Sequence, residues 1–246
     1  MKAPSRFVSI ACLALALWGV RTVARADEPA VEDAPSIVVE RVRDPAMVPY
    51  RKGYELTRRV HDVAGGSVQL LFRVRSAKTK QPVAGLQIAI EGSKSYGTLE
   101  ISPEGFFSIP LDDAALGDNA EFVTNQKKGS LELGITLKPQ LPSEGLRYAM
   151  IVDAVAAARR AIREILPWYI RLFVGSVNGV GICYAEPGAG VEISGAGAAR
   201  RPAEQSETDE LDRKVHCADF TDHEKGLAAE TVLVPTAGWQ AIFLGS

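Results

Sequence analysis

The segment from His216 to His223, H-C-A-D-F-T-D-H, holds the densest group of chemically capable side chains in this chain of 246 residues. Zinc accepts imidazole and carboxylate ligands, but the spacing here matches no established ligand motif. Cys217 beside a histidine is a candidate nucleophile, although no family signature surrounds it. The residue pattern favours a polar surface segment with a structural cysteine over both of these interpretations. The candidate metal ligands are His216, Asp219, Asp222 and His223.

Other chemical signatures are missing from the sequence. The glycines between Gly188 and Gly197 do not follow the G-x-G-x-x-G spacing, and no G-x-x-x-x-G-K-[ST] phosphate loop occurs. Gly175-Ser176 lacks the nucleophile-elbow pattern of α/β-hydrolases. The third histidine, His61, lies in a charged stretch typical of a surface. We therefore expect no cofactor and no catalytic residue.

Residues 1–26 have the pattern of a secretory signal peptide. Lys2 and Arg6 precede an apolar run from Phe7 to Val20, and Ala24-Arg25-Ala26 is a small-x-small cleavage site. The run is shorter than the ~20 residues that a transmembrane helix needs. Lipidation at Cys12 is an alternative, but the apolar run continues past that residue. The pattern predicts a periplasmic or secreted protein without a transmembrane span after cleavage.

Two cysteines remain once such a signal peptide is removed, Cys183 and Cys217. Exported proteins with an even number of cysteines usually pair them. We therefore predict a disulfide between them, which would tie the C-terminal tail to the folded body.

Alternating apolar and polar residues between Ser67 and Leu137 predict half-buried β-strands. Turn-forming Gly, Pro and Asn residues separate the runs. Short strands at this spacing are typical of an antiparallel sandwich or open barrel. The alternating sets are Val68, Leu70, Phe72 and Val74; Leu86, Ile88 and Ile90; Leu99 and Ile101; Phe107, Ile109 and Leu111; and Leu131, Leu133, Ile135 and Leu137.

Part of this region resembles a known repeating module. The steps K-Q-P-V-A-G-L-Q-I-A-I at Lys80–Ile90 and S-P-E-G-F-F-S-I-P-L at Ser102–Leu111 are similar to carboxypeptidase-regulatory-like, or transthyretin-like, β-sandwich modules. The resemblance covers residues 72–111. It implies a non-catalytic scaffold or binding module, with no active-site residues to carry over.

Two helices are expected beside these strands. Apolar residues at helical spacing predict one near residues 50–63, which Gly65-Gly66 ends, and another near 146–166, which Pro167 ends. The stripe formed by Ile151, Val155 and Ile162 must dock on an apolar surface, and the sheet offers one. The predicted fold class is α+β, a mainly antiparallel β-sandwich or open barrel with one or two packed helices.

The predicted organisation is a signal peptide at 1–26, a flexible lead-in at 27–36, a core at 37–194 and a C-terminal segment at 195–246. Ile37–Val42 is a candidate first strand, and residues 177–184 and 191–193 are a candidate hairpin. A mobile loop is expected from Gly195 to Thr208. Closing strands are expected at 231–234 and 240–244.

Two surface features are candidates for binding a partner. Trp168, Tyr169 and Phe173 belong to the densest apolar cluster after residue 26, which either anchors a partner or fills the core. Arg58 and Arg59 lie in residues 41–80, where ten Lys or Arg residues face three acids, although the whole chain has a net charge of −2. This stretch is either a basic binding face or an ordinary solvated surface. No nucleic-acid motif accompanies it, so we expect no nucleic-acid partner.

The sequence thus leads to two expectations of different class. The first is an exported, non-catalytic envelope protein that acts as a binding or structural module for a protein partner or an envelope component. The alternative is a metal-dependent or cysteine hydrolase that works from the His216–His223 segment.

Overall fold

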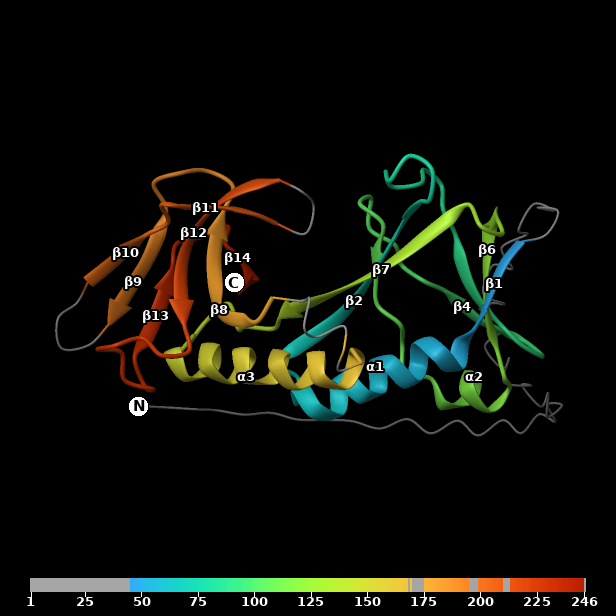
Figure 1. Cartoon of the computed structure of the whole chain (residues 1–246), viewed down its shortest axis with the longest axis horizontal. Coiled ribbons are helices and arrows are strands. Elements are labelled where there is room, and N and C mark those ends of the chain that lie inside the picture. Colours follow the sequence, from blue (N-terminus) through green and yellow to red (C-terminus); the bar gives the residue numbers. More distant parts are fainter. Residues whose placement is uncertain (1–44, 168, 170–174, 195–198, 210–212, 246) are drawn as a thin grey trace, which may run out of the picture. The chain divides into compact units, whose positions relative to one another are not determined.

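The computed structural model describes residues 45–167, 169, 175–194, 199–209 and 213–245 (Figure 1). The predicted signal peptide, the lead-in and the candidate strand Ile37–Val42 lie outside the described residues.

The described strands form four antiparallel sheets (Figure 1). Their orders are β1-β6-β3-β4, β5-β2-β7, β10-β9-β13 and β11-β12-β8-β14. The strands are β1 Pro45–Pro49, β2 Val68–Ser76, β3 Ile88–Glu91, β4 Ser95–Thr98, β5 Phe106–Phe107, β6 Glu121–Lys127, β7 Leu131–Pro139, β8 Val177–Tyr184, β9 Gly190–Ser194, β10 Ala199–Pro202, β11 Gln205–Thr208, β12 Lys214–Thr221, β13 Val232–Pro235 and β14 Gln240–Gly245.

Both predicted helices are present, as α1 Tyr50–Ala64 and α3 Tyr148–Ile165. α1 ends at Gly65, which takes the left-handed conformation that glycine adopts without a Cβ clash. A short helix, α2 Asp113–Gly117, was not predicted. The Asp112 side chain caps its start by accepting from the N–H groups of Ala114 and Ala115.

The alternation predicted for β2 is confirmed. Val68, Leu70, Phe72 and Val74 are all buried, and they belong to a hydrophobic cluster with Tyr50, Tyr54 and Val60 of α1. β2 pairs with β7 along its whole length, whereas β5 covers only Phe72 and Arg73 on its other side. The first two sheets therefore share one core with α1.

α3 joins this first cluster to a second one. Ile151 and Val155 pack with residues of β8, β9 and β12, whereas Ala157, Ala158 and Ala161 pack in the first cluster. α1 and α3 lie side by side (Figure 1). Ile162, which we expected in the buried stripe, is only half-buried, because alanines occupy the face that meets α1.

One predicted strand is absent, and another is shorter than its apolar pattern suggested. Leu99 and Ile101 lie outside any strand, and after Phe107 the chain leaves the sheet so that Pro110 and Asp112 contact Tyr50 of α1. The turn before β5 is as expected. At Gly105 a Cβ atom would lie 2.3 Å from the carbonyl oxygen of Val74, so only glycine fits there.

The predicted boundary at residues 194 and 195 falls between β9 and β10, which pair in one sheet. The predicted loop at 195–208 contains β10 and β11, although residues 195–198 lie outside the described chain. The candidate hairpin of β8 and β9 is wrong, since β8 pairs with β12 and β14, and β9 with β10 and β13. β8 and β9 are therefore adjacent in the sequence but not paired with each other. The closing strands, β13 and β14, are confirmed.

The predicted fold class is confirmed: the protein is α+β and mainly antiparallel β, with helices packed on the sheets. Across the described residues, no helix is long and apolar enough to cross a membrane.

We predict that Val155→Asp unfolds the protein. Val155 has no exposed surface, and an unpaired carboxylate buried there costs several kcal/mol, out of the ~5–15 kcal/mol that stabilises a typical domain. Thermal melting followed by circular dichroism measures the effect. Arg163→Asp, at an exposed position of the same helix, is the control. Equal melting of both variants would show that this face of α3 is not docked.

Candidate functional site

The His216–His223 segment forms most of β12 and the turn after it. His216 and Asp219 are three residues apart in a strand, so their side chains project from opposite faces of the sheet. No group of three or more histidine, cysteine or acidic side chains in the described chain is arranged to hold a metal ion. His216 and Asp219, two of the predicted metal ligands, therefore do not lie close enough in direction to bind one ion.

Cys217 is not a free thiol in this structure. Its Sγ atom lies 2.09 Å from Sγ of Cys183, so the predicted disulfide is present. The two cysteines are opposite each other on the neighbouring strands β12 and β8, and both are fully buried. The bond joins two strands of one sheet. The expectation that it ties a separate C-terminal tail to the folded body is therefore wrong. A bonded sulfur cannot serve as the thiolate nucleophile.

Asp222, in the turn after β12, has a structural role. Its carboxylate forms an ion pair with Arg159 of α3, whose Nε also donates to the carbonyl of Val177 at 2.7 Å. Burial raises the pKa of Asp222, but the hydrogen bond and the charge of Arg159 outweigh it and leave the pKa lowered. His223 extends into solvent, with 88% of its side chain exposed and Nε2 3.7 Å from Asp222.

Asp219 lies beside a salt bridge but takes no part in it. Arg201 binds both carboxylate oxygens of Glu224 at 3.2 Å and donates to the backbone carbonyl of Asp219. The Oδ1 atom of Asp219 has no hydrogen-bond partner among the described residues. Burial, followed by the nearby charge of Glu207, raises its pKa. This arrangement joins β10 to β12.

The aromatic candidates are only partly visible. Trp168 and Phe173 lie outside the described residues, and Tyr169 exposes 53% of its surface.

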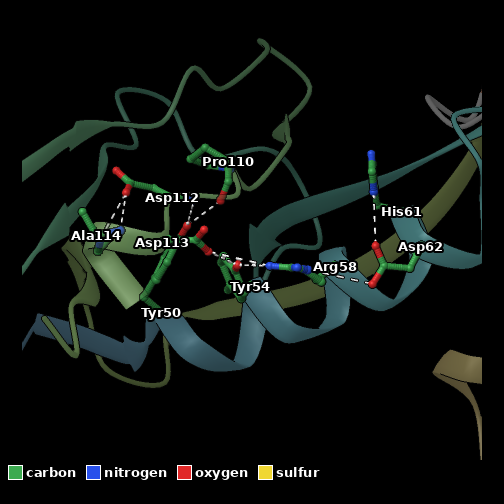
Figure 2. Close-up of polar contacts among 10 residues, drawn as sticks. Tyr50, Tyr54, Arg58, His61, Asp62, Pro110, Asp112, Asp113 and Ala114 are labelled. Carbon is green, nitrogen blue, oxygen red and sulfur yellow. Dashed lines mark hydrogen bonds and ion pairs between the residues drawn. The ribbon is translucent and has the colours of Figure 1, made fainter. Parts of the chain in front are cut away.

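Arg58 belongs to a network of mixed charge on α1 (Figure 2). It donates to the hydroxyl of Tyr54 at 2.7 Å and lies 3.8 Å from Asp62 and 3.7 Å from Asp113. The hydrogen bond to Tyr54 and the charges of both acids raise its pKa. Arg59 is exposed, and its Nε donates to the carbonyl of Glu55. Acidic side chains thus lie beside several of the basic ones on α1, and the surface is not uniformly basic.

The same network attaches residues 110–113 to α1 (Figure 2). The Tyr50 hydroxyl donates to the carbonyl of Pro110 and accepts the N–H of Asp112 at 3.0 Å, while Tyr54 donates to Asp113. Burial is the main reason that the pKa of Tyr50 is raised. The polar groups of this network thus hold residues 110–113 against α1.

The strand β7 presents a feature that the sequence did not reveal. Its apolar alternation predicted a buried face, yet Leu133 is 59% and Ile135 is 42% exposed. Their direct neighbours on β2, Val74 and Phe72, are buried on the same face of the sheet. The covering elements therefore bury this apolar face over β2 and leave it open over β7.

The backbone of β7 is open on the same side. Among the described strands β7 pairs with β2 alone, and the register runs without a bulge. At its two ends, Ala77 donates to the carbonyl of Ser130 and Gln140 donates to that of Ser67. The backbone N–H and C=O groups of the even-numbered residues of β7 therefore point toward β2. Because these groups alternate in direction along an antiparallel strand, those of the odd-numbered residues point away from β2. The residues whose backbone groups point away from β2 are the apolar ones, Leu131, Leu133, Ile135 and Leu137.

Most other edge strands of the described sheets are short or carry proline. β4, β10, β11 and β13 have four residues each, and proline stands at both ends of β1. Leu233 of β13 also donates to Leu146 on the side away from β9. Short length and proline are common devices that prevent edge pairing. β7 has nine residues, with proline only at its last position, and is the longest edge strand of the described sheets, whereas β14, an edge strand without proline, has six.

We predict that Asp222 stabilises the fold at neutral pH and loses this effect in acid. Because its folded pKa lies below the unfolded value of about 3.9, its contribution is complete above that value and disappears as the pH falls through the folded pKa. Asp222→Asn should cost about 1–3 kcal/mol at neutral pH and progressively less in acid. Urea unfolding across this pH range measures the difference. The exposed Asp153→Asn on α3 is the control, and a loss that does not depend on pH would contradict the assignment.

We also predict that proline affects neighbouring positions of β7 differently. Thr136→Pro removes an N–H that pairs with β2, at a cost of about 1–3 kcal/mol. Ile135→Pro removes an N–H that faces outward, where proline is tolerated, and should cost less than about 1 kcal/mol. Urea unfolding of the two variants tests the register. Equal losses, or a larger loss for Ile135→Pro, would show that the outward side is assigned incorrectly.

The region that resembles a carboxypeptidase-regulatory-like module contributes strands to two sheets. β2 and β5 pair in one sheet, and β3 pairs with β4 and β6 in another. These pairings are antiparallel, as in many sandwiches, and nothing in them identifies that family. Comparison of the chain with protein-family models, with curated proteins and with solved structures gave no significant match.

Proposed function

We propose that this protein is an exported, non-catalytic module that binds an extended polypeptide segment along the open edge of β7. The observation that supports this proposal best is the coincidence of two properties in the same residues. Leu133 and Ile135 expose their side chains, and their backbone N–H and C=O groups point away from β2. A strand added there gains hydrogen bonds and apolar contacts at the same time.

The chemistry of this edge defines the segment that it would accept. Main-chain hydrogen bonds carry affinity without sequence preference, whereas side chains at every second position carry specificity. The inner face of β7 is apolar, and its outer face carries Glu132 and Lys138. The preferred segment is therefore an extended one with apolar residues at alternate positions and polar residues between them.

Export is supported by the sequence of residues 1–26 and by the disulfide. Disulfides persist in oxidising compartments such as the periplasm and the extracellular space. The envelope is the compartment where we expect the partner.

The alternative function, a hydrolase at His216–His223, gains no support from the described residues. His216 and Asp219 project to opposite sides of β12, Cys217 is bonded to Cys183, and Asp222 is held by Arg159. No nucleophile, base and oxyanion donor converge there in the described chain.

We predict that peptides selected from a random displayed library on the mature protein bind the β7 edge. Such peptides should lose about two- to tenfold in affinity for Ile135→Pro, because the proline removes one outward N–H donor, and a hydrogen bond of this kind is worth about 0.5–1.5 kcal/mol. Affinity is measured by calorimetry, and Lys225→Glu, at an exposed position outside the strands, is the control. On binding, the amides of Leu133 and Ile135 should become protected from hydrogen exchange. Selected peptides that bind Ile135→Pro as tightly as wild type, or an empty selection at a concentration where the protein is monomeric, would contradict the proposal.

A further inference from the structure

The sequence of β7, L-E-L-G-I-T-L-K-P, is complementary to itself when two copies are aligned antiparallel about Ile135. In that alignment Glu132 lies opposite Lys138 of the second copy, and Leu133 lies opposite Leu137. Ile135 lies opposite itself on the two-fold axis. Opposite charges and apolar pairs that face each other across two strands each stabilise the pairing.

The backbone agrees with the same alignment. Every odd-numbered residue of β7 turns its hydrogen-bonding groups outward, and this register places odd-numbered residues opposite odd-numbered residues. A shift of one residue would oppose outward groups to inward ones, and no ladder would form. A shift that centres the pair on Leu133 keeps the ladder but places Glu132 opposite Gly134, so the charge pairs are lost.

The charged side chains are available for this contact. Glu132 forms an ion pair with Lys80 that lowers its pKa, and its side chain is still 42% exposed. Lys138 forms no ion pair with any described residue. It lines a hollow of about 720 Å³ together with Gln140, Trp239 and Gln240, which offers space for an incoming carboxylate. β14 approaches β7 in this region without pairing with it.

We propose that the partner of the β7 edge is β7 of a second copy of this chain, paired antiparallel with Ile135 on the two-fold axis. This inference rests on the proposed function, because it requires the open edge and names its occupant. The two three-stranded sheets then become one continuous sheet, β5-β2-β7-β7-β2-β5. The half-open apolar face of each copy continues into that of the other, which covers part of Leu133 and Ile135.

Complementary charge variants test the inference. Glu132→Lys and Lys138→Glu each place like charges opposite one another at two symmetric positions, so each should weaken self-association of the mature protein about tenfold. An equimolar mixture of the two variants should restore association as a heterodimer, because one chain then carries only lysine at these two positions and the other only glutamate. The double variant Glu132→Lys/Lys138→Glu should restore the homodimer. Analytical ultracentrifugation over a wide concentration range measures all four samples.

Controls separate the possible failures. Lys225→Glu changes the net charge by the same amount at an exposed position outside β7 and should associate like wild type. Thermal melting verifies that each variant is folded. Ile135→Pro should be monomeric. Dimers that survive Ile135→Pro, or single variants that are not rescued by mixing, would overturn this register. A monomeric wild type would overturn the self-pairing, whereas the library peptides would then still decide whether β7 binds another polypeptide.

Discussion

The described structure depends on the close approach that the alanine face of α3 permits. Ala154, Ala157, Ala158 and Ala161 have almost no exposed surface, and their small side chains allow α1 to pack directly against α3. Towards its N-terminus the same helix inserts Ile151 and Val155 among the residues of β8, β9 and β12. One helix thus completes two hydrophobic clusters, and a larger residue on its alanine face would separate it from α1.

A similar size constraint operates where β8 lies between β12 and β14. At Gly179 a Cβ atom would lie 2.5 Å from the carbonyl oxygen of Phe220, and at Gly181 it would lie 3.0 Å from Sγ of Cys183. Glycines therefore make room for the disulfide and for the backbone of β12. The residues that appeared chemically capable in the sequence, Cys217 and Asp222, are occupied in holding this sheet and α3 together.

The binding proposal follows from what these contacts leave uncovered. α1 and the first sheet bury the apolar face of β2, but Leu133 and Ile135 on the adjacent strand extend beyond this cover. A nine-residue edge with an apolar face invites pairing with another strand. The proposed self-pairing would satisfy the edge with a segment whose charges complement it, and it would require no other change of the fold.

Local patterns in the sequence determined the positions of α1 and α3, the buried face of β2 and the identity of the disulfide pair. Helical periodicity, strict alternation and a count of two cysteines are properties of short segments or of composition. Whether an apolar face is covered depends on elements distant in sequence, so the pattern of β7 predicted a buried strand that is in fact half-open. Strand pairing likewise decided that β8 and β9 belong to different sheets, because the strand that offers a ladder with matching register need not be the next one in the chain. The strand conformation of β12 separated His216 from Asp219, since residues three apart project to opposite faces of a strand, whereas in a helix they would share one face.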